Sequence, residues 1–238
     1  MKHRLYHPPP IAAGSTLALD RERTHYLTRV LRLRPGAAIV CFDGAGGAWS
    51  ATLMDAGRTA SLAVGEQIAN EPAPRVRVHL VQGLLKGGAM DQVVQKATEL
   101  GATDIWLVHA GRSNAPTGGD RMARKQRHWQ RVVASAAEQC GVLHLPRLHA
   151  PRNLPELLRA PPAARLIMLD PGAEPLPVTL PRASVALLIG PEGGWNDDER
   201  RLAAQAGVER RGLGERVVRA ETAPLAVLAA LQHGWGWP

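Results

Sequence analysis

Short apolar runs alternate with helical patterns over most of this chain, from about residue 75 onward. Val185–Ile189 is five apolar residues in a row, while Gly88–Leu100 repeats apolar side chains at three- and four-residue spacings. This alternation predicts a mostly parallel sheet covered by helices, an α/β fold. The predicted strands are Arg75–Gln82, Ile105–Val108, Leu166–Leu169 and Val185–Ile189, and the predicted helices are Gly88–Leu100, Arg121–Cys140, Asp197–Ala206 and Ala223–Gln232.

The first part of the chain has a different pattern, which predicts mostly β structure over residues 15–68. Asp43-Gly44 is a strong hairpin signal between two of the strand candidates. The glycines of Gly44–Gly47 indicate a turn and no dinucleotide fingerprint, because no helix follows them. Glu71–Pro74 contains two prolines and is a candidate linker. The predicted elements are strands at Leu17–Leu19, Ala38–Phe42, Gly47–Leu53 and Ser61–Val64 and a helical stretch at Asp20–Leu31.

The charge of the chain favours a nucleic-acid partner. Lys and Arg number 29 against 21 Asp and Glu, which gives a formal net charge of +8. Residues 1–36 hold seven of these cations against two acids, a net charge of +5. A solvated helix face could carry this charge, but a surface that follows phosphates is the favoured interpretation.

Apolar runs and cysteines limit the class of protein further. Leu225–Leu231 is seven apolar residues long, far short of the roughly 20 that span a bilayer. Three prolines, Pro8–Pro10, follow the basic N-terminus, so no secretory signal is expected. Cys41 and Cys140 form no CxxC pair and no disulfide framework, and a reducing cytoplasm fits them best. The histidines lack ligand-like spacing, so no metal site is expected.

The most informative segment is an apolar strand that ends in a loop rich in glycine and proline. Val185–Ile189 runs into Gly190–Gly194 and Trp195, and a helix is expected to begin after Asn196 as its N-cap. Ligands of open α/β sheets bind beyond the carboxyl ends of strands, where glycines let the backbone approach closely. No Lys-Ser or Lys-Thr follows, so this is not a P-loop, and the nearby carboxylates favour a cationic or neutral ligand. A tight turn without any ligand is the alternative.

A second polar segment, Leu213–Pro224, precedes the last apolar helix. Thr222 could cap that helix, and Pro224 suits its first turn. Arg219 and Glu221 could belong to a site or form a solvated ion pair.

A third segment, Lys86-Gly87-Gly88, connects a predicted strand to a predicted helix. Gly101 follows that helix and is expected at its C-terminal cap. Lys86 could bind a phosphate or simply be exposed.

In this order, the three segments resemble the bacterial methyltransferases that modify N3 of a uridine in 16S ribosomal RNA, members of the SPOUT class. The resemblance covers nearly the whole chain. Each block alone is weak, but their order and spacing together are very specific. The blocks outside the three segments are Arg4–His7, His25–Gly36, Phe42–Gly44, Gln82-Gly83, Asp91–Gly101, Arg112-Ser113, Trp129–Arg131 and Ala136–Gln139.

The resemblance implies two domains. Residues 1–70 would form a PUA-like RNA-binding β-barrel, and residues 73–238 would form a SPOUT α/β-knot methyltransferase domain with a C-terminal trefoil knot. Knots are otherwise almost absent from folds, so composition could not indicate this one. The family normally forms a homodimer with the cofactor site near the interface.

The resemblance also implies the reaction and its site. S-adenosylmethionine would be the cofactor, without a metal, and 16S ribosomal RNA of the small ribosomal subunit the partner. RNA would contact Arg4, Arg29, Arg32, Arg34, Lys86 and Arg112. The cofactor would be bound by Leu169, Pro171, Ile189, Gly190, Pro191, Glu192, Gly193, Gly194, Leu213, Gly214, Arg216, Val217, Val218, Thr222 and Ala223.

Uracil N3 carries an imide proton, so the reaction calls for a base and for stabilisation of the developing imidate. We expect Arg219 to stabilise the oxyanion and Glu221 to act as the base or to orient it. Glu192 suits a structural role in the glycine loop equally well. The transfer itself needs N3 and the methyl carbon held in line.

Three alternatives remain open on the sequence. The chain could be an RNA-binding protein without catalysis, a SPOUT methylase for another RNA position or atom, or a small-molecule α/β enzyme. The basic charge argues against the last. The chain departs from the family pattern at Gly88-Ala89, Trp195 and Pro224, which puts local contacts in doubt.

Overall fold

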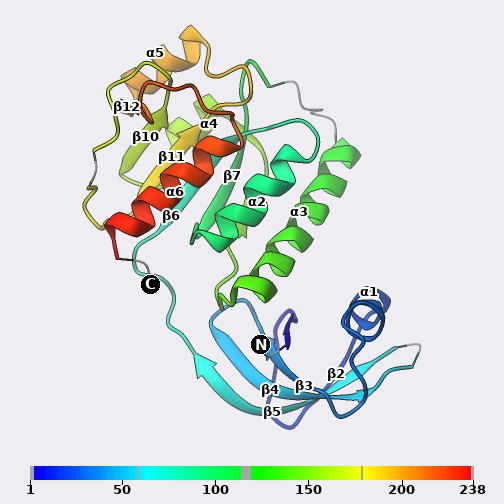
Figure 1. Ribbon diagram of the computed structural model, residues 1–238. Helices are drawn as coiled ribbons and strands as arrows, with labels where there is room; N and C mark the ends of the chain where they lie inside the picture. The colour runs from blue at the N-terminus through cyan, green and yellow to red at the C-terminus, as the bar shows by residue number, and fades with distance from the viewer. Residues whose placement is uncertain (1–2, 58, 114–118, 178, 237–238) are drawn as a thin grey trace. The chain divides into compact units, whose positions relative to one another are not determined.

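The computed structural model describes residues 3–57, 59–113, 119–177 and 179–236. The chain forms two compact units (Figure 1). The first comprises the chain up to Ala73 together with residues 137–145. The second comprises residues 74–136 and the chain from Pro146 onward. Each unit is therefore assembled from segments that are separated in the sequence.

The first unit is built on a five-stranded sheet with the order β1-β3-β4-β5-β2. Strands β1 and β3 are parallel to each other, and the other three neighbouring pairs are antiparallel. The hairpin predicted at Asp43-Gly44 joins β3 to β4, and Gly44 has a φ of +73°. The strands are β1 (His3–Tyr6), β2 (Thr16–Ala18), β3 (Ala38–Phe42), β4 (Gly47–Asp55) and β5 (Ser61–Asn70).

The helical stretch between β2 and β3 is shorter and less regular than predicted. Asp20 caps α1 (Arg21–His25) by accepting a hydrogen bond from the backbone N–H of Arg23. One π-helical turn, η1 (Tyr26–Val30), follows. Arg32 then takes the left-handed conformation with a φ of +54°, and the Leu33 N–H donates to the carbonyl oxygen of Leu27. This helical stretch packs Leu27 into the hydrophobic core of the first unit. The buried residues of that core include Leu5, Leu17, Leu27, Cys41, Leu53 and Leu62.

Residues 137–145 complete the first unit. The Glu138 carboxylate accepts a hydrogen bond from the Tyr6 N–H at 2.9 Å, and burial raises the pKa of Glu138. Phe42 and Leu143 are both buried in a second apolar cluster. The sequence does not predict this assignment, because Ala137 and the residues after it continue the pattern of the preceding helix.

The second unit contains the predicted parallel sheet, which is confirmed. Its strand order is β12-β10-β11-β6-β7-β8, with β9 also paired to β7. All of these pairs are parallel. The central strand β11 is buried along its whole length, as its five apolar residues require. The strands are β6 (Val78–Gly83), β7 (Asp104–His109), β8 (Arg147–Leu148), β9 (Arg152–Asn153), β10 (Arg165–Leu169), β11 (Val185–Ile189) and β12 (Glu209–Arg211).

Helices cover both faces of this sheet. On one face, α4 and α5 pack through Leu157 and Ala203 against a cluster that includes Val81, Met168 and Leu188. Over the other face lie α2 and α6, which contact each other (Figure 1). The helix that ends at Gly101 has the predicted left-handed glycine, with a φ of +78°. The helices are α2 (Ala89–Glu99), α3 (Gly119–Cys140), α4 (Leu154–Arg159), α5 (Asp197–Gln205) and α6 (Thr222–Gly234).

Candidate functional site

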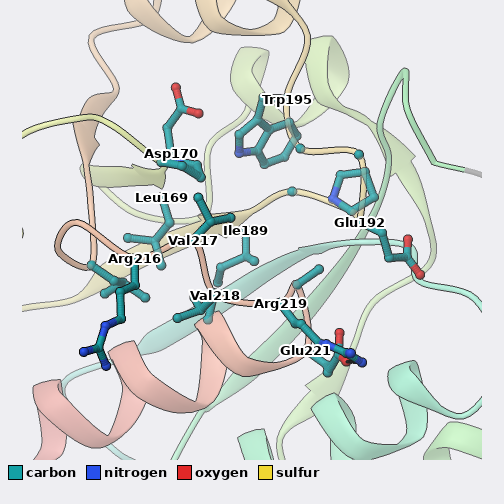
Figure 2. A pocket seen from close by; sticks show the side chains of 18 of the residues that line it. Leu169, Asp170, Ile189, Glu192, Trp195, Arg216, Val217, Val218, Arg219 and Glu221 are labelled. Atoms are coloured by element: carbon teal, nitrogen blue, oxygen red, sulfur yellow. Dashed lines mark ion pairs between the residues drawn. The ribbon is translucent and has the colours of Figure 1, made fainter.

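A cavity of about 670 Å³ lies in the second unit, beyond the carboxyl ends of β10 and β11. This is the size expected for a small organic ligand or a cofactor. Three segments line it, the glycine loop and residues of the segment before α6, both singled out in the sequence, and the chain that follows β10 (Figure 2). The lining residues are Ala89, Leu169, Asp170, Pro171, Ile189, Gly190, Pro191, Glu192, Gly193, Gly194, Trp195, Arg200, Leu213, Gly214, Arg216, Val217, Val218, Arg219, Ala220, Glu221 and Ala223.

The structure thus brings together every residue predicted to hold the cofactor except one. Thr222 is exposed and is absent from the lining. The prediction that Thr222 caps the last helix is wrong, because Thr222 is already the first residue of α6 and Glu221 stands at the N-cap. The side chain of Glu221 makes no capping hydrogen bond to the helix.

The glycine loop after β11 is held by tight backbone packing. A side chain at Gly83, the last residue of β6, would lie 2.7 Å from the Pro191 nitrogen. Gly194 has a φ of +66°, which favours glycine. The loop ends where Asn196 caps α5, as predicted. The Asn196 side chain accepts from the Glu199 N–H, while the Glu199 carboxylate accepts from the Asn196 N–H, both at 2.8 Å.

Two cations predicted to bind RNA lie at this same loop. The Lys86 backbone N–H donates to Oε1 of Glu192 at 2.9 Å, so Glu192 ties the glycine loop to the turn before α2. The Arg112 guanidinium donates to the Gly193 carbonyl oxygen at 3.0 Å. The side chain of Lys86 is exposed and makes no ion pair with a described residue.

Asp170 is a site residue that the sequence analysis missed. It follows β10 directly, and its carboxylate accepts hydrogen bonds from Nε of Arg200 at 2.8 Å and from Nε of Arg210 at 3.0 Å. The hydrogen bond to Asp170 raises the pKa of Arg200. Asp170 is 2% exposed, so this buried charge is compensated by two arginines from later elements. Its place at the end of an apolar strand was the one sequence signal for it.

The pocket has two chemically different ends (Figure 2). At one end Arg219 lies beside Glu221, with 3.8 Å between Nη1 and Oε1. The Arg219 side chain is 87% exposed, whereas that of Glu221 is 20% exposed. Arg216 lies at the other end and points away from this pair. The apolar part of the lining includes Leu169, Ile189, Val218 and Trp195.

The N-terminal cations predicted to bind RNA do not form one group. Arg29, Arg32 and Arg34 are exposed and make no ion pair with a described residue. Arg4 is different: its guanidinium donates to the Gly141 carbonyl oxygen at 2.8 Å and lies over the ring of Phe42. Arg4 therefore makes a structural contact within the first unit, and its predicted RNA contact stays a prediction.

Among the described residues, no group of three or more His, Cys, Asp or Glu side chains is arranged to hold a metal ion. None of the described helices is long and apolar enough to cross a membrane.

The fold and the pocket define a class of protein, the RNA methyltransferases. Residues 71–232 match the family described as RNA methyltransferase domain, and residues 19–64 match the RNA methyltransferase PUA domain. The chain is 37% identical to the ribosomal RNA small subunit methyltransferase E of Synechocystis sp., over 97% of this chain and 77% of the relative. It therefore belongs to the ribosomal RNA small subunit methyltransferase E family.

Solved structures resemble the whole chain. The ribosomal RNA small subunit methyltransferase E of Neisseria gonorrhoeae, bound to S-adenosylmethionine, is 32% identical with a TM-score of 0.87, covering 100% of this chain and 98% of that one. A protein of Legionella pneumophila in complex with the same cofactor is 30% identical with a TM-score of 0.91, covering 98% of both chains.

Proposed function

We propose that this chain transfers the methyl group of S-adenosylmethionine to N3 of a specific uridine in the 16S ribosomal RNA of the small subunit. Three observations support the proposal. The chain belongs to the methyltransferase E family. Two structures that resemble it over nearly their full length contain S-adenosylmethionine. The glycine loop and most residues of 213–223 line one pocket at the carboxyl ends of the strands, which is the observation that carries the proposal.

The residues of the pocket fit this cofactor. The apolar wall formed by Leu169, Ile189 and Val218 suits a purine ring. The carboxylate of Glu221 lines the pocket and favours the positive charge of a sulfonium. Gly190 and Gly193 keep this loop closely packed beside the pocket, since a Cβ at Gly193 would lie 2.9 Å from the Cβ of Arg112 and one at Gly190 would lie 3.2 Å from the Gly194 backbone. When bound, S-adenosylmethionine supplies an already activated methyl group, so no metal is needed.

Glu221 and Arg219 are the groups proposed to act on the uracil. A carboxylate at Glu221 accepts the imide proton of N3, which frees the nitrogen lone pair to attack. Arg219 lies 3.8 Å from Glu221 and is exposed enough to contact an incoming base. Its positive charge stabilises the negative charge that develops on the uracil oxygens. Because a base in folded RNA is stacked or paired, it must be extruded to reach these groups.

The remaining parts of the proposal concern binding and assembly. The first unit contributes the exposed Arg29, Arg32 and Arg34 to contacts with RNA phosphates. The trefoil knot and the homodimer with a cofactor site near its interface are proposed on the family resemblance.

The deciding experiment is methyl transfer from labelled S-adenosylmethionine to small ribosomal subunits that lack base methylation, followed by nucleoside analysis. Labelled 3-methyluridine is the expected product. Label in another nucleoside would support methyltransferase activity but would refute uridine as the target. No label with any RNA, combined with absent cofactor binding by calorimetry, would leave an RNA-binding protein without catalysis as the better function.

A further inference from the structure

The exposed side of α3 carries a row of arginines. Arg121, Arg124 and Arg127 follow one another at three-residue spacing and are all exposed. Buried residues of the same helix, among them Met122 and Trp129, lie on its other side. We call Arg121, Arg124 and Arg127 the arginine face.

The charge of this face is not compensated locally. None of its three arginines makes an ion pair or a hydrogen bond with a described residue. Asp120 is the only acidic residue between positions 119 and 136, whereas the same stretch also contains Lys125. Like charges on neighbouring turns of a helix repel each other, so the arrangement costs stability unless an anion binds there.

The helix that carries the arginine face packs against α2, whose first residue lines the pocket. Ala89, at the start of α2, lines the pocket, and Asp91 is two residues further along the same turn. The Asp91 carboxylate accepts hydrogen bonds from the Trp129 indole N–H at 2.9 Å and pairs with Nε2 of His128 at 2.8 Å. Asp91 therefore fixes α3 beside α2 (Figure 1). Arg124 and Arg127 lie in the preceding turns of α3, on the side of the helix that faces away from this contact.

We propose that the arginine face binds the sugar-phosphate backbone of the substrate RNA, as a second anchor on the methyltransferase unit itself. The inference rests on the proposed RNA substrate. Arg121 to Arg127 span about 9 Å along the helix axis, enough to contact more than one phosphate. Guanidinium groups bind phosphates through paired hydrogen bonds. Lys86, in the turn before α2, and Arg219, in the pocket lining, are further exposed cations of the same unit.

The test is the salt dependence of RNA binding. Binding of an unmodified 16S ribosomal RNA transcript is measured by filter retention over a range of salt concentrations. In the triple variant Arg121→Gln/Arg124→Gln/Arg127→Gln, the slope of log K against log salt should become shallower by about 2 to 3, since each lost phosphate contact contributes about 0.7 to 0.9. The corresponding triple lysine variant should keep most of the slope, because lysine retains the charge.

A matched control removes the same charge elsewhere. Arg75, Arg159 and Arg182 are exposed on the second unit and make no ion pair with a described residue. Arg75 and Arg182 precede β6 and β11, so they lie at the edge of the sheet opposite to the pocket. Their triple glutamine variant should bind RNA with the wild-type slope.

Three outcomes would overturn the inference: a wild-type slope in the arginine-face variant, an equal loss in the control variant, or wild-type binding that does not depend on salt. Failure of the proposed function would look different. Wild-type protein would then not methylate small subunits, while the slope of RNA binding would still depend on the arginine face.

Discussion

The guanidinium of Arg112 donates to the carbonyl oxygen of Gly193, and the aliphatic part of the same side chain fills the space where a side chain at position 193 would stand. A Cβ there would lie 2.9 Å from the Cβ of Arg112, closer than such atoms normally approach. Gly193→Ala must therefore displace the glycine loop or Arg112. We expect cofactor affinity to fall about tenfold or more, because a shift of the loop changes the backbone groups that line the pocket. Calorimetric titration with S-adenosylmethionine measures this.

Gly88→Ala is the matched control for Gly193→Ala. Gly88 precedes α2, has no atom within 4 Å of an added Cβ and has a φ of −75°. Its replacement should leave cofactor affinity unchanged. An unchanged affinity in the Gly193→Ala protein would show that the loop is not the cofactor cradle.

The catalytic proposal predicts separate effects on turnover and on cofactor binding. Glu221→Gln removes the proton acceptor and should lower kcat by about 10²- to 10⁴-fold. Arg219→Gln should also lower kcat, because it removes the charge that stabilises the imidate. Glu215→Gln is the control, since Glu215 lies in the same segment but does not line the pocket. Single-turnover methylation with saturating cofactor measures the chemical step. Wild-type turnover in both Glu221→Gln and Arg219→Gln would refute these roles.

A buried carboxylate away from the pocket predicts a pH dependence of stability. Burial acts to raise the pKa of Asp104, but hydrogen bonds from His149, Arg77 and Thr103 outweigh it and hold the pKa well below its usual value. The unfolded chain therefore takes up this proton first as the pH falls. The stabilisation is present above about pH 4, where the unfolded carboxyl ionises, and is lost on further acidification.

Asp104→Asn should accordingly lower the free energy of unfolding near pH 7 by about 3 kcal/mol, the low end for a broken buried pair because Arg77 is 40% exposed. The difference from wild type should shrink below about pH 4. Urea denaturation at several pH values measures it. Glu209→Gln breaks the more exposed pair with Arg165 and should cost about 1 kcal/mol or less. A cost for Asp104→Asn no larger than that would contradict the argument.

Arg32 has a backbone conformation that favours glycine, with a φ of +54°. Arg32→Gly should keep or raise the free energy of unfolding, by up to about 1 kcal/mol, since relief of the strain exceeds the extra entropy of the unfolded glycine. RNA affinity should nevertheless fall, because a cation is lost. At Arg34, which lacks a positive φ, the change to glycine should lower stability by about 0.5 to 1 kcal/mol. Thermal unfolding and RNA titration of both variants separate the effect of backbone strain from the effect of charge. A loss of stability in Arg32→Gly would contradict the presence of strain at this position.

Much of the fold could be predicted because buried strands and helices leave local patterns of apolar residues in the sequence. The strands at Ala38–Phe42 and Val185–Ile189 have the predicted bounds, since each is an apolar run within a sheet. The strand Glu209–Arg211 could not be predicted, because it pairs only with β10 at the edge and its three residues are charged. Two-residue strands such as Arg152–Asn153 leave no pattern at all.

The site was predictable where its residues cluster in sequence. The glycine loop and the segment before α6 could be recognised as blocks. Asp170 could not, because its compensation depends on Arg200 and Arg210, which lie 30 and 40 residues later. The structural contact of Arg4 could not be predicted either. Its partner, the Gly141 carbonyl oxygen, lies 137 residues away and no local pattern reveals it.

The interleaving of the two units constrains how the chain is made. The ribosome delivers β1 to β5 first, but the acceptor for the Tyr6 N–H and the carbonyl oxygen for Arg4 arrive only with Glu138 and Gly141, after most of α3 has been synthesised. When β1 to β5 have been synthesised, the first unit is still incomplete, because it also needs residues 137–145, which lie in the sequence between two segments of the second unit. Recombination that cuts the gene after Ala73 would therefore not transfer a self-sufficient RNA-binding module.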